Sequence, residues 1–167
     1  MSRELNSMRQ LNYPSTEFPA PPTFRFDVPI DWIPTSVAGT VAAVRCEVAP
    51  ASFAPNVVVT IERVSVSRDD VLRRQSDVID SLNDVAKLDE LDLDITGVSW
   101  RVWEYAFTEA RAGTLVQVVA TTVIGDHEPA QAVSIVGSVT ADRAEEFLPT
   151  IRAIVRSMFL DQGKNSS

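Results

Sequence analysis

The sequence predicts an α+β fold, an α/β/α sandwich in which a mostly antiparallel sheet of about six to seven strands lies between two amphipathic helices. The strongest evidence is three consecutive segments rich in Val, Ile, Thr and aromatic residues, at positions 98–107, 115–124 and 132–140. Short turns separate them, which is typical of an antiparallel meander. Neither face of the middle segment is charged, so we expect both faces of the sheet to be covered by helices.

Three further strands are predicted ahead of the meander, at residues 23–28, 40–47 and 56–66. The first alternates apolar and polar side chains, and the third is apolar enough to be central. Pro29 should end the first strand, and residues 31–34 should form a turn anchored by Trp32. Residues 87–96 alternate Leu or Ile with Asp, which suits either an exposed strand or an ordered loop.

Two helices are predicted from apolar stripes of helical spacing. Ser67 and Asp70 form a capping-box pattern, and an amphipathic helix should follow over residues 69–86. A second helix should follow Thr140, with its apolar stripe running from residue 144 to 159. Pro149 interrupts that stripe, so we expect a kink there, or a break between two shorter helices.

The domain organisation is simple. Residues 1–22 contain four prolines among polar residues and should form a disordered or extended arm, because proline removes backbone donors and fixes φ. Residues 23–160 should form a single domain, and residues 161–167 a flexible tail.

Charge excludes two classes of partner. The formal net charge is −8, and the 15 Lys and Arg residues are scattered along the chain. Nucleic acids and anionic membrane surfaces both require clustered cations, so neither is an expected partner. The sequence has no run of about 18 apolar residues that could insert in a membrane. It has no signal peptide or lipid-anchor cysteine either, so as written we expect a cytoplasmic protein.

Catalytic, metal and cofactor sites are not predicted. The only histidine, His127, lies in a polar turn, and the only cysteine, Cys46, lies in a predicted strand. Residues 92–97 begin like a calcium loop, but the position that requires a bidentate glutamate is Trp103. The six glycines are isolated, which excludes a glycine-rich phosphate loop. We therefore expect neither enzymatic activity nor a cofactor.

A binding site is predicted from the aromatic residues of the meander. Trp103 and Tyr105 should share one face of their strand, while Trp100 lies on the other. These rings could simply pack beneath the helices. Alternatively, the Trp103 face is partly open between a helix and the sheet edge and forms a groove, where Arg101 and Arg63 would orient an acidic group.

Three segments also resemble the PsbP-like α/β/α sandwich superfamily, and within it the actinobacterial LpqN/LpqT lipoprotein family most. They are residues 24–29 followed by Trp32, the strand at 56–63 and the helix at 147–158. The resemblance covers about residues 22–160. It implies a mostly non-enzymatic domain that binds a protein partner. LpqN-type members usually carry a signal peptide and a lipid-anchor cysteine, which this chain lacks.

The expected function is therefore a non-enzymatic binding domain that holds a protein or peptide partner in a groove between sheet and helix. Two alternatives stay open. The first is a small-molecule carrier with an aromatic pocket near Trp103 and Tyr105. The second is a structural homodimer joined through an exposed sheet edge, so that the protein would be a monomer or a weak homodimer.

Overall fold

The computed structural model describes residues 9–125 and 128–161. Its main feature is a seven-stranded sheet in which every neighbouring pair is antiparallel. In spatial order the strands are β2 (Trp32–Pro34), β3 (Ala42–Cys46), β4 (Asn56–Val64), β8 (Ala130–Thr140), β7 (Gly113–Ile124), β6 (Val98–Glu109) and β5 (Ala86–Ile95). The predicted meander is thus confirmed as β6, β7 and β8.

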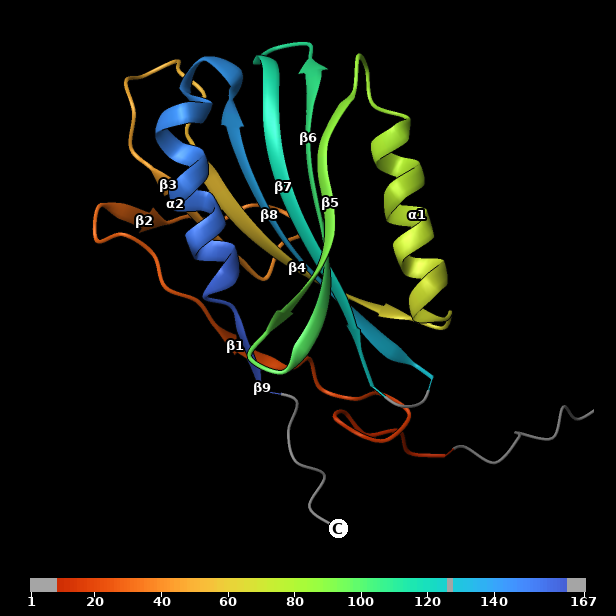
Figure 1. Ribbon diagram of the computed structural model, residues 1–167. Coiled ribbons are helices and arrows are strands. Elements are labelled where there is room, and N and C mark those ends of the chain that lie inside the picture. The colour runs from red at the N-terminus through yellow and green to blue at the C-terminus, as the bar shows by residue number, and fades with distance from the viewer. Residues whose placement is uncertain (1–8, 126–127, 162–167) are drawn as a thin grey trace, which may run out of the picture.

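The two helices cover opposite faces of this sheet (Figure 1). Helix α1 (Arg68–Asp80) packs on the face that carries Trp103 and Tyr105. Helix α2 (Ala144–Arg156), preceded by a 3₁₀ turn at Ala141–Arg143, packs on the face that carries Trp100. Because side chains alternate along a strand, each strand contributes to two separate cores. The predicted α/β/α arrangement is confirmed.

The chain before β3 differs from the prediction. Only Thr23–Arg25 of the predicted first strand is extended, as β1, and it pairs with β9 (Phe159–Asp161) outside the main sheet. The predicted turn around Trp32 is wrong, because Trp32–Pro34 forms edge strand β2 against β3. Trp32 is buried against Phe147 of α2, and this tertiary contact holds the short strand in place.

Helix α1 is shorter than predicted. The Ser67 hydroxyl accepts a hydrogen bond from the Asp70 backbone N–H at 3.1 Å, which confirms the predicted N-cap. The helix ends at Asp80, and Asp84 has φ 51°, a left-handed conformation that redirects the chain into β5. The ambiguous segment at 87–96 is therefore a strand, and Ala86–Ile95 pairs with β6 along its length.

Helix α2 is a single helix despite Pro149. The proline lies in the second turn, where it removes one backbone donor and leaves the longer C-terminal part of the helix intact. That part is anchored by Ile151, Ile154 and Val155, each at most 2% exposed. Burial of side chains of this size contributes about 1.5–3 kcal/mol each. Tertiary packing therefore offsets the cost of the proline.

Each helix covers only part of its face. Helix α2 lies over β8 and β7, so the same face of β6 and β5 extends beyond it. Helix α1 lies over β7 and β6 on the other face, which leaves β4 and β8 partly uncovered there. This offset creates a hollow beside each helix.

The arm before β1 lies against the lower end of β4 and β8. Residues 9–22 contain no helix or strand. The Gln131 amide donates a hydrogen bond to the Ala20 carbonyl at 2.7 Å, and the Arg63 guanidinium lies over the Phe18 ring at 5.6 Å.

Candidate functional site

The candidate site is a groove of about 380 Å³ between α2 and the uncovered part of β5 and β6. Its exposed surface is about equally polar and apolar, and its apolar lining consists of Leu91 and Leu93 on β5, Val102 on β6, Val118 on β7 and Val155 on α2. Leu88 forms part of its rim and is 56% exposed. A volume of this size lies within the range of protein binding sites, at its lower end.

The alternation of β5 places these residues. Leu91 pairs with Val102 and Leu93 with Trp100, so their side chains lie on the α2 face of the sheet. A bulge between Lys87 and Asp89 changes the register at Leu88, near the N-terminal end of the strand. The leucines of β5 therefore extend the core outward past the edge of α2.

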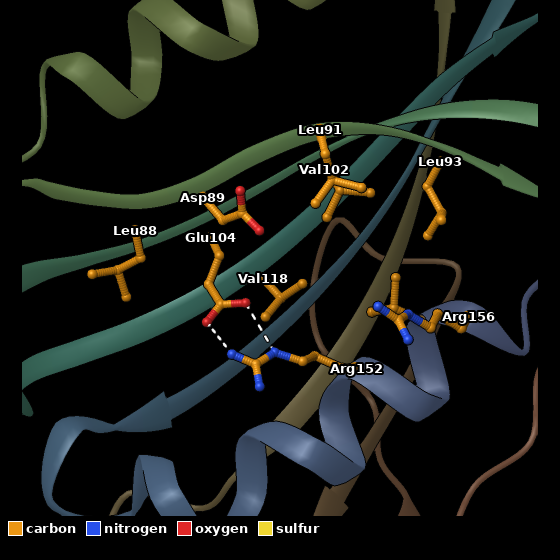
Figure 2. Close-up of a pocket in the computed structure, with 10 residues that line it drawn as sticks. Leu88, Asp89, Leu91, Leu93, Val102, Glu104, Val118, Arg152 and Arg156 are labelled. Atoms are coloured by element: carbon orange, nitrogen blue, oxygen red, sulfur yellow. Dashed lines mark hydrogen bonds and ion pairs between the residues drawn. The ribbon is translucent and has the colours of Figure 1, made fainter.

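An ion pair crosses the groove between sheet and helix (Figure 2). Arg152 of α2 donates from Nε and Nη2 to the two carboxylate oxygens of Glu104 on β6, at 3.0 and 2.5 Å. The Glu104 side chain is only 12% exposed, whereas that of Arg152 is 45% exposed. The hydrogen bonds to Glu104 raise the pKa of the Arg152 guanidinium, so the guanidinium stays protonated.

The two ends of the groove carry opposite charges (Figure 2). Asp89 lies beside Leu88 at one end, where its carboxylate also accepts a hydrogen bond from the Glu90 backbone N–H at 2.9 Å. Arg156 lies near Leu93 at the other end. Within the described residues, Arg156 has no hydrogen-bond or ion-pair partner. The groove thus combines apolar residues and a crossing ion pair with an acidic and a basic end.

The hollow on the opposite face is smaller. It lies between α1 and the uncovered parts of β4 and β8, and its volume is about 200 Å³. Its sheet surface includes Thr60, Glu62, Thr121 and Ser134. Val64, Val71 and Val78 add apolar surface, so this hollow is no more polar than the groove beside α2. The groove beside α2 is the better candidate site because its larger volume lies within the range of protein binding sites.

Trp103 and Tyr105, two of the residues predicted to bind a partner, are 2% and 3% exposed and pack beneath α1. The Tyr105 hydroxyl donates to Gln117 Oε1 at 2.7 Å, and Gln117 Nε2 donates to Ser138 Oγ at 2.8 Å. Burial raises the pKa of Tyr105 to about 12. These contacts are those of a core residue with a satisfied hydroxyl.

The two predicted arginines are far from one another in the fold. Arg101 lies beside Trp103 in a hollow of about 310 Å³ between α1 and β5. Its guanidinium is already held by Asp92 at 2.7 and 3.1 Å and by Glu90 at 2.9 Å. Arg63 lies on the α2 face of β4 and contacts the N-terminal arm. The structure therefore brings Arg101 and Trp103 together, but not Arg63.

The groove beside α2 was not predicted from sequence. Its leucines belong to the segment whose strand character was ambiguous, and Arg152 belongs to a helix expected to kink. The usable signal was the alternation of Leu91, Leu93 and Ile95 with aspartates, since a strand with one apolar face needs something to cover that face.

The residues considered for catalysis and metal binding are placed as follows. Cys46 is buried in β3, and this burial raises the pKa of its thiol, which disfavours the nucleophilic thiolate. His127 lies outside the described residues. Across residues 9–125 and 128–161, no group of three or more His, Cys, Asp or Glu side chains is arranged to hold a metal ion. No helix in the same ranges is long and apolar enough to cross a membrane.

Comparison with known proteins yields matches in structure only. No protein-family model matches the sequence, and no curated protein matches it significantly. One similar structure is that of LpqN, a Mycobacterium tuberculosis protein involved in cell envelope biogenesis. Its sequence is 15% identical to this chain, 85% of each chain is covered, and the TM-score is 0.72.

Two more distant structures share the architecture. Cyanobacterial PsbP (CyanoP) from Synechocystis sp. PCC 6803 is 15% identical over 83% of this chain and 86% of its own, with a TM-score of 0.57. PA94, a protein of unknown function from Pseudomonas aeruginosa, is 9% identical over 80% of this chain and 99% of its own, also with a TM-score of 0.57. At these identities the likeness shows the fold alone: the chain has the PsbP-like fold that LpqN shares, as the resemblance in its sequence predicted.

Proposed function

We propose that this chain is a non-enzymatic binding domain that holds a protein or peptide segment in the groove between α2 and β5. The observation that carries the proposal is the apolar surface of Leu91 and Leu93, which pack against the core but stay partly exposed beside α2. Apolar surface of this kind gains free energy when a partner removes it from water. Asp89 and Arg156 at the two ends would orient the partner.

The shape of the site supports an extended segment over a small molecule. The groove is open along β5, and its rim residue Leu88 is 56% exposed. A small ligand is normally enclosed over most of its surface. The aromatic pair that a carrier would use, Trp103 and Tyr105, already fills the space beneath α1. A chain segment can instead lie along the groove and place successive side chains in it.

Site-specific photo-crosslinking tests this proposal in the cells that make the protein. A photoreactive amino acid replaces Leu88 in one full-length variant and Val78 in another. Both side chains are 56% exposed, but Leu88 borders the groove and Val78 lies on α1, beside the smaller hollow of the opposite face. We expect a discrete protein adduct from position 88 that is absent from position 78. The additional variant Arg156→Glu should reduce that adduct.

Two results would contradict the proposal. Equal adduct patterns at positions 88 and 78 would show that contact is determined by exposure alone. A small molecule or lipid as the sole adduct at position 88 would instead support the carrier.

A further inference from the structure

The long edge strand beside the groove is the second feature of this site. The sheet ends at β2 on one side and at β5 on the other. Strand β2 has three residues, whereas β5 has ten, and most of its side chains are exposed. In the described part of the chain no strand pairs with the outer side of β5. Its outward backbone groups are therefore available to a further strand, except the Glu90 N–H, which is bonded to the Asp89 carboxylate.

The turn that follows β5 determines which backbone groups point outward. Thr96 and Gly97 connect β5 to β6 with φ values of 53° and 82°, as in a type I′ hairpin, and Ile95 pairs with Val98 across the turn. In such a hairpin the flanking pair is hydrogen-bonded, and bonded pairs then alternate along the ladder. The backbone groups of residues 90, 92 and 94 are consequently the ones that face away from β6.

The same residues carry three of the four acidic side chains of the strand. Glu90, Asp92 and Asp94 lie on the α1 face, while Asp89, Leu91 and Leu93 lie on the α2 face beside the groove. A hollow borders β5 on each face, of about 310 Å³ on the α1 side and about 380 Å³ on the α2 side. A strand added at this edge would find open space for the side chains on both of its faces.

The charge of the edge is strongly negative. Asp89, Glu90, Asp92 and Asp94 are carboxylates, and Arg101 on β6 is the cation that pairs with two of them. Lys87 is the one cation on β5, and its Nζ forms an ion pair with Asp80 Oδ1 of α1 at 2.8 Å. An added strand would therefore meet an excess of negative charge on the α1 face and an apolar surface on the other.

We propose that β5 pairs antiparallel with an extended basic segment of a partner protein, in which Lys or Arg alternates with apolar residues. The basic side chains lie opposite Glu90, Asp92 and Asp94, and the apolar ones enter the groove opposite Leu91 and Leu93. This inference rests on the proposed function and specifies its partner. Antiparallel addition continues the pattern of the whole sheet.

A second copy of this chain fits the edge poorly. In a continuous sheet made by two copies of β5, residues of the same face lie opposite one another. If the pairing is centred on Leu91, Glu90 lies opposite Asp92 of the other copy. If it is centred on Asp92, the Asp92 residues of the two copies lie opposite one another. Like charges directly opposite are destabilising. The acidic side chains that oppose self-pairing thus favour a basic partner.

The test uses a capped synthetic peptide, Lys-Leu-Lys-Val-Lys-Leu-Lys, and the full chain, with binding measured by NMR titration. Two N-methylated forms are the matched controls. Methylation of the lysine amides removes the N–H groups that would face β5, whereas methylation of the Leu and Val amides changes the outer side only. We expect the first form to lose binding and the second to retain it. On binding the parent peptide, the amides of Asp92 and Asp94 should exchange more slowly with solvent.

Protein variants test the charge component. The double variant Glu90→Gln, Asp92→Asn should weaken binding by about three- to tenfold and reduce its dependence on salt. The control double variant Asp31→Asn, Glu47→Gln removes the same charge from exposed residues at the β2–β3 side of the sheet, and it should bind the peptide with unchanged affinity.

Several outcomes would overturn the inference. Equal binding by both methylated peptides, or loss in both, would exclude pairing at this edge, and loss only on methylation of Leu and Val would exclude the antiparallel orientation. If the peptide fails to bind while the adduct at position 88 persists, the strand-pairing inference is wrong and the proposed function stands. If position 88 gives no specific adduct, the proposed function itself is lost.

Discussion

Ile151 of α2 packs directly against Gly137 of β8, in the space where any other residue would carry a side chain. A Cβ at Gly137 would overlap with Ile151 Cγ2, and it would also approach Val57 Cγ2 to 3.5 Å. Gly137 has no left-handed φ, so close approach of the helix is what requires glycine here. This contact sets the distance of α2 from the sheet, and with it the depth of the groove.

The variant Gly137→Ala should destabilise the protein by about 1–3 kcal/mol, because α2 must move outward. Ile151→Ala alone should cost about 2–5 kcal/mol through the cavity it leaves. In the double variant the new methyl group occupies part of that cavity, so the two effects should fall short of additivity by about 1 kcal/mol or more. Urea unfolding of the four proteins measures this coupling, and additive values would show that the close approach is not what requires glycine.

Sequence patterns predicted the structural features that depend on residues close together in the chain. The alternation in β6, β7 and β8 gave the meander, and the Ser67–Asp70 pattern gave the start of α1. The pairing of β1 with β9 joins Thr23 to Asp161, and no local pattern reveals so distant a partner. Trp103 was correctly assigned to the face opposite Trp100, but its burial depends on where α1 lies across the sheet.

The groove could not be predicted from the sequence, because it also depends on contacts between residues that are far apart in the chain. Its existence depends on the lateral position of α2, which follows from the contact between Gly137 and Ile151 and from the packing of Phe147 against Trp32. The leucines of β5 looked like one side of an exposed strand, and only the offset of the helix shows that they border a hollow.

The ion pair between Glu104 and Arg152 should respond asymmetrically to mutation. Arg152→Met leaves the nearly buried Glu104 carboxylate without its partner, at a cost of about 1–2 kcal/mol, between the values typical of surface and buried pairs. Glu104→Gln leaves a half-exposed guanidinium that water can solvate and should cost less than about 1 kcal/mol. Urea unfolding at neutral pH compares them. A smaller loss for Arg152→Met would contradict the burial difference, and the double variant should recover part of that loss.

Tyr105 should make stability fall at alkaline pH. Its pKa is about 12 in the folded protein and 10.0 as a free side chain, so the unfolded chain releases the proton first as pH rises. The folded state is therefore favoured below pH 10, and this contribution is lost progressively between pH 10 and 12, by about 2–3 kcal/mol in all. Unfolding free energies measured across this interval check the trend.

Tyr105→Phe provides the control for this titration. It removes the ionisable hydroxyl and leaves Gln117 without the donor at 2.7 Å, so stability at neutral pH should fall by about 1 kcal/mol. The additional decline between pH 10 and 12 should be smaller than in the wild type. An unchanged slope in Tyr105→Phe would mean that other groups cause the alkaline loss.

The contact between Gln131 and Ala20 predicts that the N-terminal arm is protected from proteolysis. Gln131 is 9% exposed, and its amide donates to the Ala20 carbonyl at 2.7 Å. In Gln131→Ala the arm loses this hydrogen bond and should detach from the sheet more often. A glutamate-specific protease should then cleave after the neighbouring Glu17 about threefold to tenfold faster. Gln75→Ala, on the opposite face of the sheet, should leave the rate unchanged.

Deletion of the arm should then remove the difference between the variants. Without residues 1–20, Gln131 and Arg63 lose their contacts with Ala20 and Pro19 and become hydrated instead. The truncated wild type and truncated Gln131→Ala should therefore unfold at similar urea concentrations, because the hydrogen bond that separated them no longer exists. If the two truncated proteins still unfold at different urea concentrations, Gln131 stabilises the sheet without the arm. The change in cleavage rate at Glu17 would then reflect the stability of β8 and not the attachment of the arm.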